Sequence, residues 1–180
     1  ITYHALNAAI GLEIFHTFTL LHDDIMDRSN LRRGKETVHR KWNSNVAILS
    51  GDTMFAIATK FINDLNHQQR QKILDVFTDT AIEVCEGQQY DMDFEDEPMV
   101  QIPEYLNMIR LKTAVLLGAS LQIGALTGNA DHVQSQLLYD FGVNVGMAFQ
   151  LKDDYLETFG DREKFGKQIG GDIRANKKTY

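Results

Sequence analysis

The segment Leu21-His22-Asp23-Asp24-Ile25-Met26-Asp27 ends a long apolar pattern and carries three carboxylates within five positions. Before it, apolar residues recur at three- and four-residue spacing, which predicts a helix over residues 3–27. Positions i and i+4 of a helix lie about 40° apart around its axis, so Asp23 and Asp27 share a face. Carboxylates on so apolar a helix are costly to bury unless a cation neutralises them. The segment therefore predicts a helix that ends in a cation site.

A second segment, Leu151-Lys152-Asp153-Asp154-Tyr155-Leu156-Glu157, repeats this pattern far along the chain. Asp153 and Glu157 share a helical face in the same way. An isolated copy of such a motif is more often a solvated helix end, but duplication after apolar residues favours a metal site. Magnesium prefers oxygen ligands and commonly binds a substrate phosphate as well. The two segments together predict a diphosphate site bridged by magnesium.

Composition limits the class of protein. The chain has 180 residues, of which 43% are hydrophobic, and this is enough for one domain with its own core. A net charge of −7 argues against a general nucleic-acid surface. Basic residues instead follow the two acidic segments closely: Arg28, Arg32, Arg33 and Lys35, then Lys164, Lys167, Lys177 and Lys178. This distribution favours a small anionic ligand.

Three further expectations concern the cellular compartment, membrane segments and the completeness of the domain. Cys85 is the only cysteine, which excludes an intrachain disulfide and favours a reducing, cytoplasmic setting. We find no signal peptide and no apolar run long enough to span a bilayer. Both termini fall within apparent structure, so we expect a domain that is incomplete at both ends.

The remaining pattern is helical throughout. We predict a loop over 28–39, further helices over 45–65, 68–92 and 103–127, and a final helix ending at Phe159. Gly128 is expected to end the fourth helix. No segment alternates as a strand does. The prediction is an all-α single domain over residues 1–180.

Arg32 and Arg33 follow the first acidic segment. A paired arginine in a loop is usually a solvated charge, yet guanidinium groups bind phosphate oxygens in a bidentate manner. Adjacent side chains on an extended segment point in opposite directions, so the pair could bind two different diphosphates.

The two acidic segments and the Leu31-Arg32-Arg33-Gly34 stretch resemble the trans-isoprenyl diphosphate synthases, or polyprenyl synthetases, in residues and order. The resemblance covers essentially the whole chain. It extends to His16, Gly51-Asp52, Gln88 with Asp91, Lys112-Thr113, Phe149-Gln150, Gly166-Lys167, Gly171-Asp172 and Lys177. It implies an isoprenoid-synthase-type helical bundle around a central cavity, working as a homodimer.

Residue roles follow from the resemblance. It implies a cluster of magnesium ions, three in number, with Asp23, Asp27 and Asp153 as direct ligands and Asp24, Asp154 and Glu157 in support. Arg32, Lys112 and Lys167 would bind the allylic diphosphate, with Lys177 near that pocket, while Arg33 and His16 would bind isopentenyl diphosphate. Thr113 and Gln150 would lie beside the reacting carbons, and Gln88 and Asp91 would line the allylic site.

The implied reaction is prenyl transfer, in which an allylic cation is attacked by the double bond of isopentenyl diphosphate. Phe18, five residues before Asp23, and Phe15 are expected beneath the metal site. Bulky rings there would block a long tail, which predicts a product of fifteen or twenty carbons, such as farnesyl or geranylgeranyl diphosphate.

Two departures and three alternatives remain. Glu157 stands where a third aspartate is usual, and the family's Gly-Lys-x-x-Arg segment is absent from these residues. A terpene cyclase would use similar aspartates but would leave the two arginines and His16 without a purpose. A non-catalytic partner subunit would be free to lose carboxylates. A plain helical interaction domain would leave the buried charges unexplained.

Overall fold

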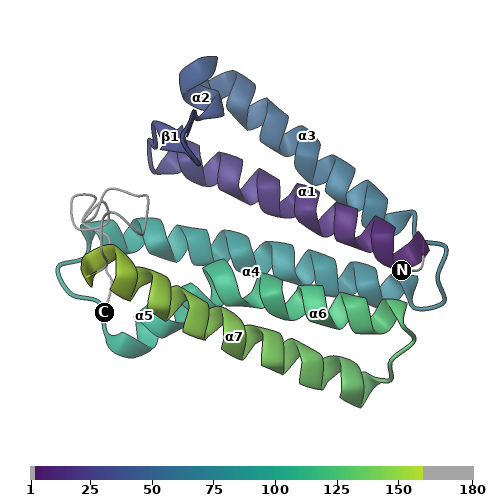
Figure 1. Cartoon of the computed structure of the whole chain (residues 1–180). Coiled ribbons are helices and arrows are strands. Elements are labelled where there is room, and N and C mark those ends of the chain that lie inside the picture. Colours follow the sequence, from purple (N-terminus) through teal and green to yellow (C-terminus); the bar gives the residue numbers. More distant parts are fainter. Residues whose placement is uncertain (1–2, 160–180) are drawn as a thin grey trace. The chain divides into compact units, whose positions relative to one another are not determined.

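The computed structural model describes residues 3–159, without the side chains of residues 3, 4 and 157, and confirms the all-α class. Its elements are α1 (Tyr3–Met26), β1 (Leu31–Arg32), β2 (Lys35–Glu36), α2 (Val38–Lys41), α3 (Ser44–Asn63), α4 (Arg70–Asp96), α5 (Ile102–Ile109), a π-helical turn η1 (Arg110–Ala114), α6 (Val115–Thr127) and α7 (His132–Phe159). The main helices lie where the apolar periodicity places them (Figure 1).

Local side chains define several helix ends. Asn43 caps α3, because its Oδ1 accepts a hydrogen bond from the backbone N–H of Val46 at 2.9 Å. Asp131 caps α7 in the same way through the N–H of Gln134 at 2.8 Å. α6 ends at Thr127, directly before Gly128, as predicted, but the residue that adopts the left-handed conformation is Asn129, with φ 62°. Asparagine is the usual second choice after glycine for that conformation.

The segment over residues 28–39 is not a plain loop. Leu31 pairs with Glu36 and Arg32 with Lys35 in a two-residue antiparallel ladder. The two residues between the strands, Arg33 and Gly34, both have positive φ, at 52° and 75°. This is the pattern of a type I′ turn, whose twist matches that of the flanking strands. The hairpin was missed because strands of two residues leave no alternating pattern.

Contacts divide the chain into two compact units: residues 1–75 with 126–129, and residues 76–125 with 130–180. In the first unit α1 and α3 lie side by side (Figure 1). Phe15, Ala58 and Ile62 are buried in this unit. Gly11 permits the close packing, since a Cβ there would lie 3.1 Å from the side chain of Ile62.

The second unit contains most of α4 and all of α5, η1 and α7. Its apolar cluster comprises Val100, Tyr105, Met108 and Ile109, with Phe94, Leu106 and Met147 packed against them. The predicted continuous helix over 103–127 is interrupted, because the five residues of η1 follow π geometry. Such turns insert one extra residue into a helix and recur at functional sites.

One stretch, Ile102–Thr127, is long and apolar enough to cross a membrane by length and composition alone. The sequence pattern predicts no apolar run of that length, and Ile102–Thr127 is an exception to this expectation. In the structure 44% of its apolar window is buried, and one such helix is weak evidence for a membrane span, because the core helix of a soluble protein passes the same test.

Candidate active site

The end of α1 presents the first acidic segment. The backbone N–H of Asp27 donates to the carbonyl of Asp23 at 2.9 Å, so the two residues are one helical turn apart. Both side chains are half-buried on the face that the sequence predicts. Two carboxylates at this spacing supply oxygen donors of the kind that magnesium prefers. The donor set of the first unit therefore fits a magnesium ion.

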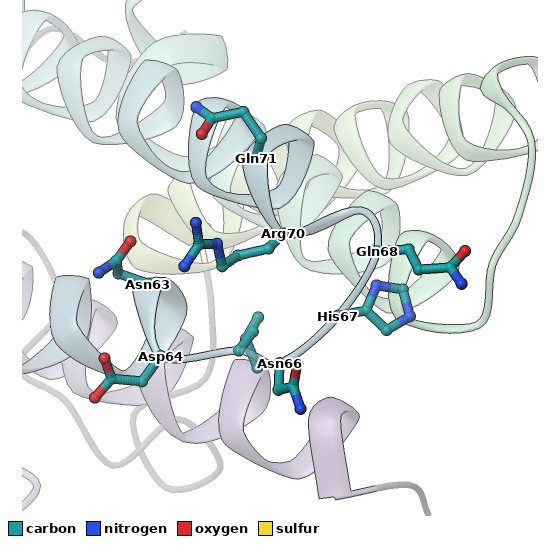
Figure 2. Close-up of a pocket in the computed structure, with 8 residues that line it drawn as sticks. Asn63, Asp64, Asn66, His67, Gln68, Arg70 and Gln71 are labelled. Atoms are coloured by element: carbon teal, nitrogen blue, oxygen red, sulfur yellow. The ribbon is translucent and has the colours of Figure 1, made fainter.

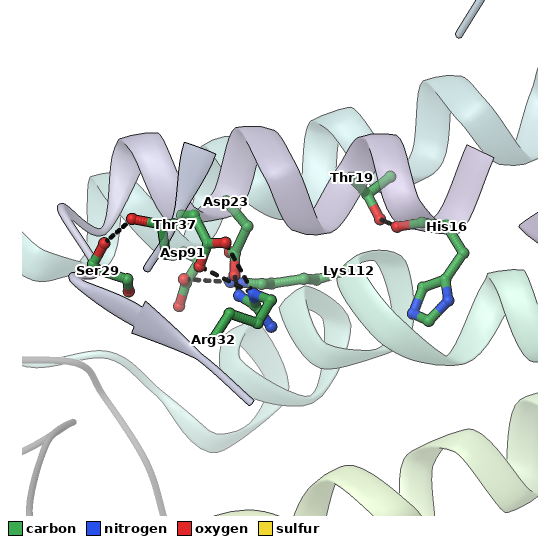
Figure 3. A network of polar contacts seen from close by, with 9 residues as sticks. His16, Thr19, Asp23, Ser29, Arg32, Thr37, Asp91 and Lys112 are labelled. Atoms are coloured by element: carbon green, nitrogen blue, oxygen red, sulfur yellow. Dashed lines mark hydrogen bonds and ion pairs between the residues drawn. The ribbon is translucent and has the colours of Figure 1, made fainter. Parts of the chain in front are cut away.

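Arg32 binds the two adjacent aspartates of this segment, and Figure 3 shows its side chain beside Asp23. Its Nε lies 2.9 Å from both carboxylate oxygens of Asp24, and a terminal nitrogen lies 3.1 Å from Oδ2 of Asp23. Asp24 is only 6% exposed. Burial works to lower the pKa of Arg32, but the hydrogen bonds and negative charges of Asp24 and Asp23 outweigh it, and the pKa lies above its ordinary value. A permanent cation thus lies against the acidic end of α1.

The two other predicted diphosphate contacts of the first unit are exposed to solvent. Arg33 lies at the tip of the hairpin and is exposed. His16 lies on α1 two turns before Asp23, and its ring is 3.7 Å from the carboxylate of Glu13. The His16 side chain is 42% exposed, so it is not a core histidine.

Gly51 makes room for the histidine next to Asp23. A Cβ on Gly51 would lie 2.2 Å from Nε2 of His22, so any side chain would displace the ring. In its present place the same nitrogen lies 3.3 Å from the carbonyl oxygen of Ile48. Gly51 therefore has a packing role that holds the end of α1 against α3.

Aromatic rings fill the space behind the acidic segment within the first unit. Phe18 stacks on Phe55 of α3 with ring centroids 5.3 Å apart, and Phe15 lies 5.5 Å from Phe18. Phe15 and Phe18 are 1% and 9% exposed. Both predicted product-length residues are thus buried and belong to one aromatic cluster, whose third ring, Phe55, is partly exposed.

In the second unit, η1 presents Lys112 beside α4. Lys112 Nζ lies 2.7 Å from Oδ2 of Asp91, whose side chain is 8% exposed. The approach of the two elements depends on Gly87, where a Cβ would lie 2.2 Å from the backbone nitrogen of Lys112. The structure thus brings together two predicted residues that lie far apart in the sequence. It also shows Gly87, which the sequence analysis did not single out, at their crossing.

Gln88 follows Gly87 on α4, and the environment of its side-chain nitrogen is unusual. Its Nε2 is buried and has no hydrogen-bond partner within the described part of the chain. An orphaned buried donor is uncommon in a folded protein and calls for a functional reason. A donor held ready in this way suits the predicted role of Gln88 beside an anionic ligand.

Thr113 and Gln150, both predicted beside the reacting carbons, are in direct contact. The hydroxyl of Thr113 lies 3.0 Å from Oε1 of Gln150, and Nε2 of Gln150 lies 2.7 Å from Oδ1 of Asp154. The other oxygen of Asp154 accepts a hydrogen bond from the hydroxyl of Tyr105. Tyr105, which the sequence analysis missed, is 1% exposed. Its only sequence signal is a polar hydroxyl on the apolar face of α5, which it shares with Met108 and Ile109.

The structure describes only some of the remaining predicted ligands. Asp153 is half-buried near the end of α7. The side chain of Glu157 and the whole of Lys167 and Lys177 lie outside the described residues. Within residues 3–159, no three His, Cys, Asp or Glu side chains form a preassembled metal cluster. The assignment of all six carboxylates to magnesium therefore stays a prediction.

A cavity of about 610 Å³ lies at the turn between α3 and α4. Figure 2 shows polar side chains around it, including Asn63, His67 and Arg70. None of the residues that line it is among the predicted site residues. We do not assign this cavity to the chemistry of the acidic segments.

Comparisons with known proteins agree on one family. The family model described as Polyprenyl synthetase matches residues 2–180. The geranylgeranyl diphosphate synthase of Sulfolobus acidocaldarius is 45% identical over 97% of this chain and 54% of its own length. The geranylfarnesyl diphosphate synthase of Aeropyrum pernix is 42% identical over 97% of this chain and 57% of its own. A crystal structure of a geranylgeranyl pyrophosphate synthase matches with a TM-score of 0.94 and 58% identity, over 98% of this chain and 54% of that one. The chain thus spans about half the length of these relatives.

Proposed function

Because the chain belongs to the polyprenyl synthetase family, we propose that the complete protein is a trans-prenyltransferase. It condenses isopentenyl diphosphate with an allylic diphosphate, head to tail, and releases diphosphate. The observation that carries this proposal is Arg32, a cation that donates to both Asp24 and Asp23 at the end of α1. A cation beside oxygen donors for a metal suits the recognition of a diphosphate.

In this proposal Asp23, Asp27 and Asp153 bind magnesium directly, with three ions per site. The fit rests on the donor chemistry, since each acidic helix presents carboxylate oxygens on a half-buried face. When bound, magnesium would neutralise the leaving diphosphate. Asp24 and Glu157 support the ligands, and Arg32 holds Asp24 in place by donating to both of its carboxylate oxygens.

The cations of the chain hold the substrates. Arg32, Lys112 and Lys167 bind the allylic diphosphate, with Lys177 nearby, while Arg33 and His16 bind isopentenyl diphosphate. The exposure of Arg33 and His16 supports their access to a soluble substrate. Asp91 holds Lys112 at 2.7 Å and so fixes the ammonium group. Gln88, next to this pair on α4, lines the same allylic site.

The reaction breaks the carbon–oxygen bond of the allylic diphosphate, and both electrons leave with the diphosphate. The double bond of isopentenyl diphosphate then attacks the allylic cation. Loss of a proton to the departed diphosphate restores a double bond, five carbons further along. Arg32 and Lys112 stabilise the negative charge that develops on the leaving group. Thr113 and Gln150 face the reacting carbons.

We expect a product of fifteen or twenty carbons. Phe18 and Phe15 are buried and pack against the partly exposed ring of Phe55 in the first unit, and rings so packed would stop a growing tail. The name of the Sulfolobus relative, a geranylgeranyl diphosphate synthase, supports the longer of these two lengths. That of the Aeropyrum relative, a geranylfarnesyl diphosphate synthase, shows that similar chains also make longer products.

The proposal includes a homodimer located in the cytoplasm, for which family membership and the single cysteine are the support. The mass of the complete protein in solution, measured by light scattering, tests the dimer.

The test is incubation of the full-length protein with magnesium, isopentenyl diphosphate and allylic diphosphates of graded length, followed by sizing of the products by chromatography. Extension in units of five carbons supports the proposal. Cyclic products formed without isopentenyl diphosphate would identify a terpene cyclase. Absence of turnover until an active synthase is added would identify a partner subunit.

A further inference from the structure

We propose that Tyr105 and Asp154 are positioning residues that fix the direction of the Thr113 hydroxyl through the amide of Gln150. The inference rests on the proposed prenyl transfer and assigns Asp154 a role other than metal ligand. Its basis is one continuous chain of hydrogen bonds in the second unit, from α5 through α7 to η1.

Both oxygens of Asp154 are occupied by protein donors. The hydroxyl of Tyr105 donates to Oδ2, and the side-chain N–H of Gln150 donates to Oδ1 at 2.7 Å. Asp154 is 6% exposed and Tyr105 is 1% exposed. A buried carboxylate with two neutral donors directed at it is stabilised where it lies, facing the apolar cluster around Tyr105. Asp153, one residue earlier, is half-buried and keeps its proposed role as the ligand of this segment.

The carboxylate imposes a direction on the chain. The side-chain nitrogen of Gln150 donates to Asp154, so its NH₂ group is directed towards the carboxylate and its carbonyl oxygen towards Thr113. Thr113 must then donate its only hydroxyl hydrogen to Gln150, at 3.0 Å. The lone pairs of Oγ1 are left for whatever approaches Thr113. Lone pairs stabilise a developing allylic cation, whereas a hydroxyl hydrogen in the same place would repel it.

The backbone supports the same geometry. Gly146 lies one helical turn before Gln150 on α7, and a Cβ there would lie 2.6 Å from Cα of Ala114. The two elements therefore approach closely at the end of η1. Thr113 is within the π turn, which rotates its short side chain relative to a regular helix. Close approach and π geometry together let Thr113 reach Gln150.

The chain contains a matched control on the same helix. Gln136 donates to Asp140 at 2.9 Å, with the same i to i+4 spacing as Gln150 and Asp154. Gln136 is half-buried and Asp140 is exposed, and the bond between them is exposed to solvent. Asp140→Asn therefore makes the same carboxylate-to-amide change in a helical Gln–Asp pair without altering the hydrogen-bonded chain that ends at Thr113.

The experiment measures kcat, both KM values and the magnesium dependence of condensation by the full-length protein. Asp154→Asn is expected to lower kcat by about tenfold to a hundredfold, less than removal of a direct charge-stabilising group. Tyr105→Phe, which keeps the ring and the fold, is expected to lower kcat by a smaller factor. Both variants should leave the KM values and the magnesium concentration for half-maximal rate within about twofold of wild type. Asp140→Asn should match wild type in every quantity.

A double-mutant cycle separates positioning from general damage. If Asp154 acts through Thr113, Asp154→Asn should cost little further kcat in a Thr113→Val background, because the group it orients is gone. Three results would overturn the positioning role alone. They are additive losses of kcat in the double mutant, an effect of Asp154→Asn equal to that of Asp140→Asn, and an increased magnesium requirement. A wild-type protein that makes no condensation product would overturn the proposed function and this role together.

Discussion

The two acidic segments match in sequence but differ in the partners of their second aspartate. Asp24 and Asp154 are both 6% exposed. Asp24 receives a guanidinium from Arg32, only eight residues further along the chain. Asp154 receives two neutral donors, of which Tyr105 is 49 residues earlier. The first segment is thus stabilised by a local ion pair, and the second by a hydrogen-bonded chain across helices.

This difference shows that the second aspartate can face the protein in both copies of the motif while its hydrogen-bond partners differ. In both segments the second aspartate faces the protein, and the first aspartate stays half-buried on the helix. The inward aspartate is held by protein donors in each case. The ion pair brings a cation to the first segment, whereas the second segment orients a neutral hydroxyl. The predictions below test this comparison.

The largest effect on kcat is expected from the first aspartate of each segment, because both are proposed metal ligands. Asp23→Ala and Asp153→Ala should each lower kcat of the complete protein by about a hundredfold to a thousandfold or more, since each removes a proposed metal ligand that stabilises the leaving group. Steady-state kinetics at saturating magnesium measure both losses. Near-normal turnover in either variant would contradict the shared role of the first aspartates.

Gly87→Ala tests whether the second unit, which contains the second acidic segment, depends on the close backbone contact between α4 and η1. Its Cβ would lie 2.2 Å from the Lys112 nitrogen, so α4 or η1 must shift. We expect the free energy of unfolding to fall by about 1–3 kcal/mol, as measured by denaturant unfolding. Gly124→Ala is the control, because a Cβ at Gly124 meets no atom within 4 Å. Equal destabilisation by both changes would show that the crossing at Gly87 has no special importance.

Arg32→Lys tests the ion pair of the first segment. Lysine keeps the charge but cannot donate to both oxygens of Asp24 and to Asp23 together. Because the Arg32 side chain is 35% exposed, solvent screening reduces the effect, and we expect a loss of about 1–2 kcal/mol in unfolding free energy. Arg40→Lys, an exposed change in the same unit, should have almost no effect. If both variants unfold at the same denaturant concentration, the ion pair does not stabilise the helix end.

The smallest effect is expected at the hairpin that carries Arg32. Arg33 adopts a φ of 52°, which a non-glycine side chain tolerates poorly, while asparagine is favoured at this place in a type I′ turn. Arg33→Asn should therefore raise the free energy of unfolding by about 0.5–1 kcal/mol. The same change should increase the KM for isopentenyl diphosphate, because it removes a proposed donor. An unchanged KM with higher stability would leave Arg33 a structural residue only.

Much of the fold follows from local pattern. The apolar spacing predicts a helix over 3–27, and α1 is found at Tyr3–Met26. The same reasoning locates α3 and α7, because a helical period of 3.6 residues is visible within any few turns. Acidic residues on a shared helical face are equally readable, as Asp23 and Asp27 show. Membership of the family also follows from the order of these motifs.

Other features depend on contacts between distant segments. Nothing near Lys112 in the sequence marks the π turn, because its geometry is maintained where α4 and α7 approach it at Gly87 and Gly146. The short hairpin depends on two backbone torsion angles rather than on a repeating pattern. The sequence by itself determined the helices, the family and the carboxylates. Only the tertiary structure decided which carboxylate faces a protein partner. Hydrogen bonds such as that from Tyr105 to Asp154 form between different helices, and no local sequence pattern predicts how those helices pack.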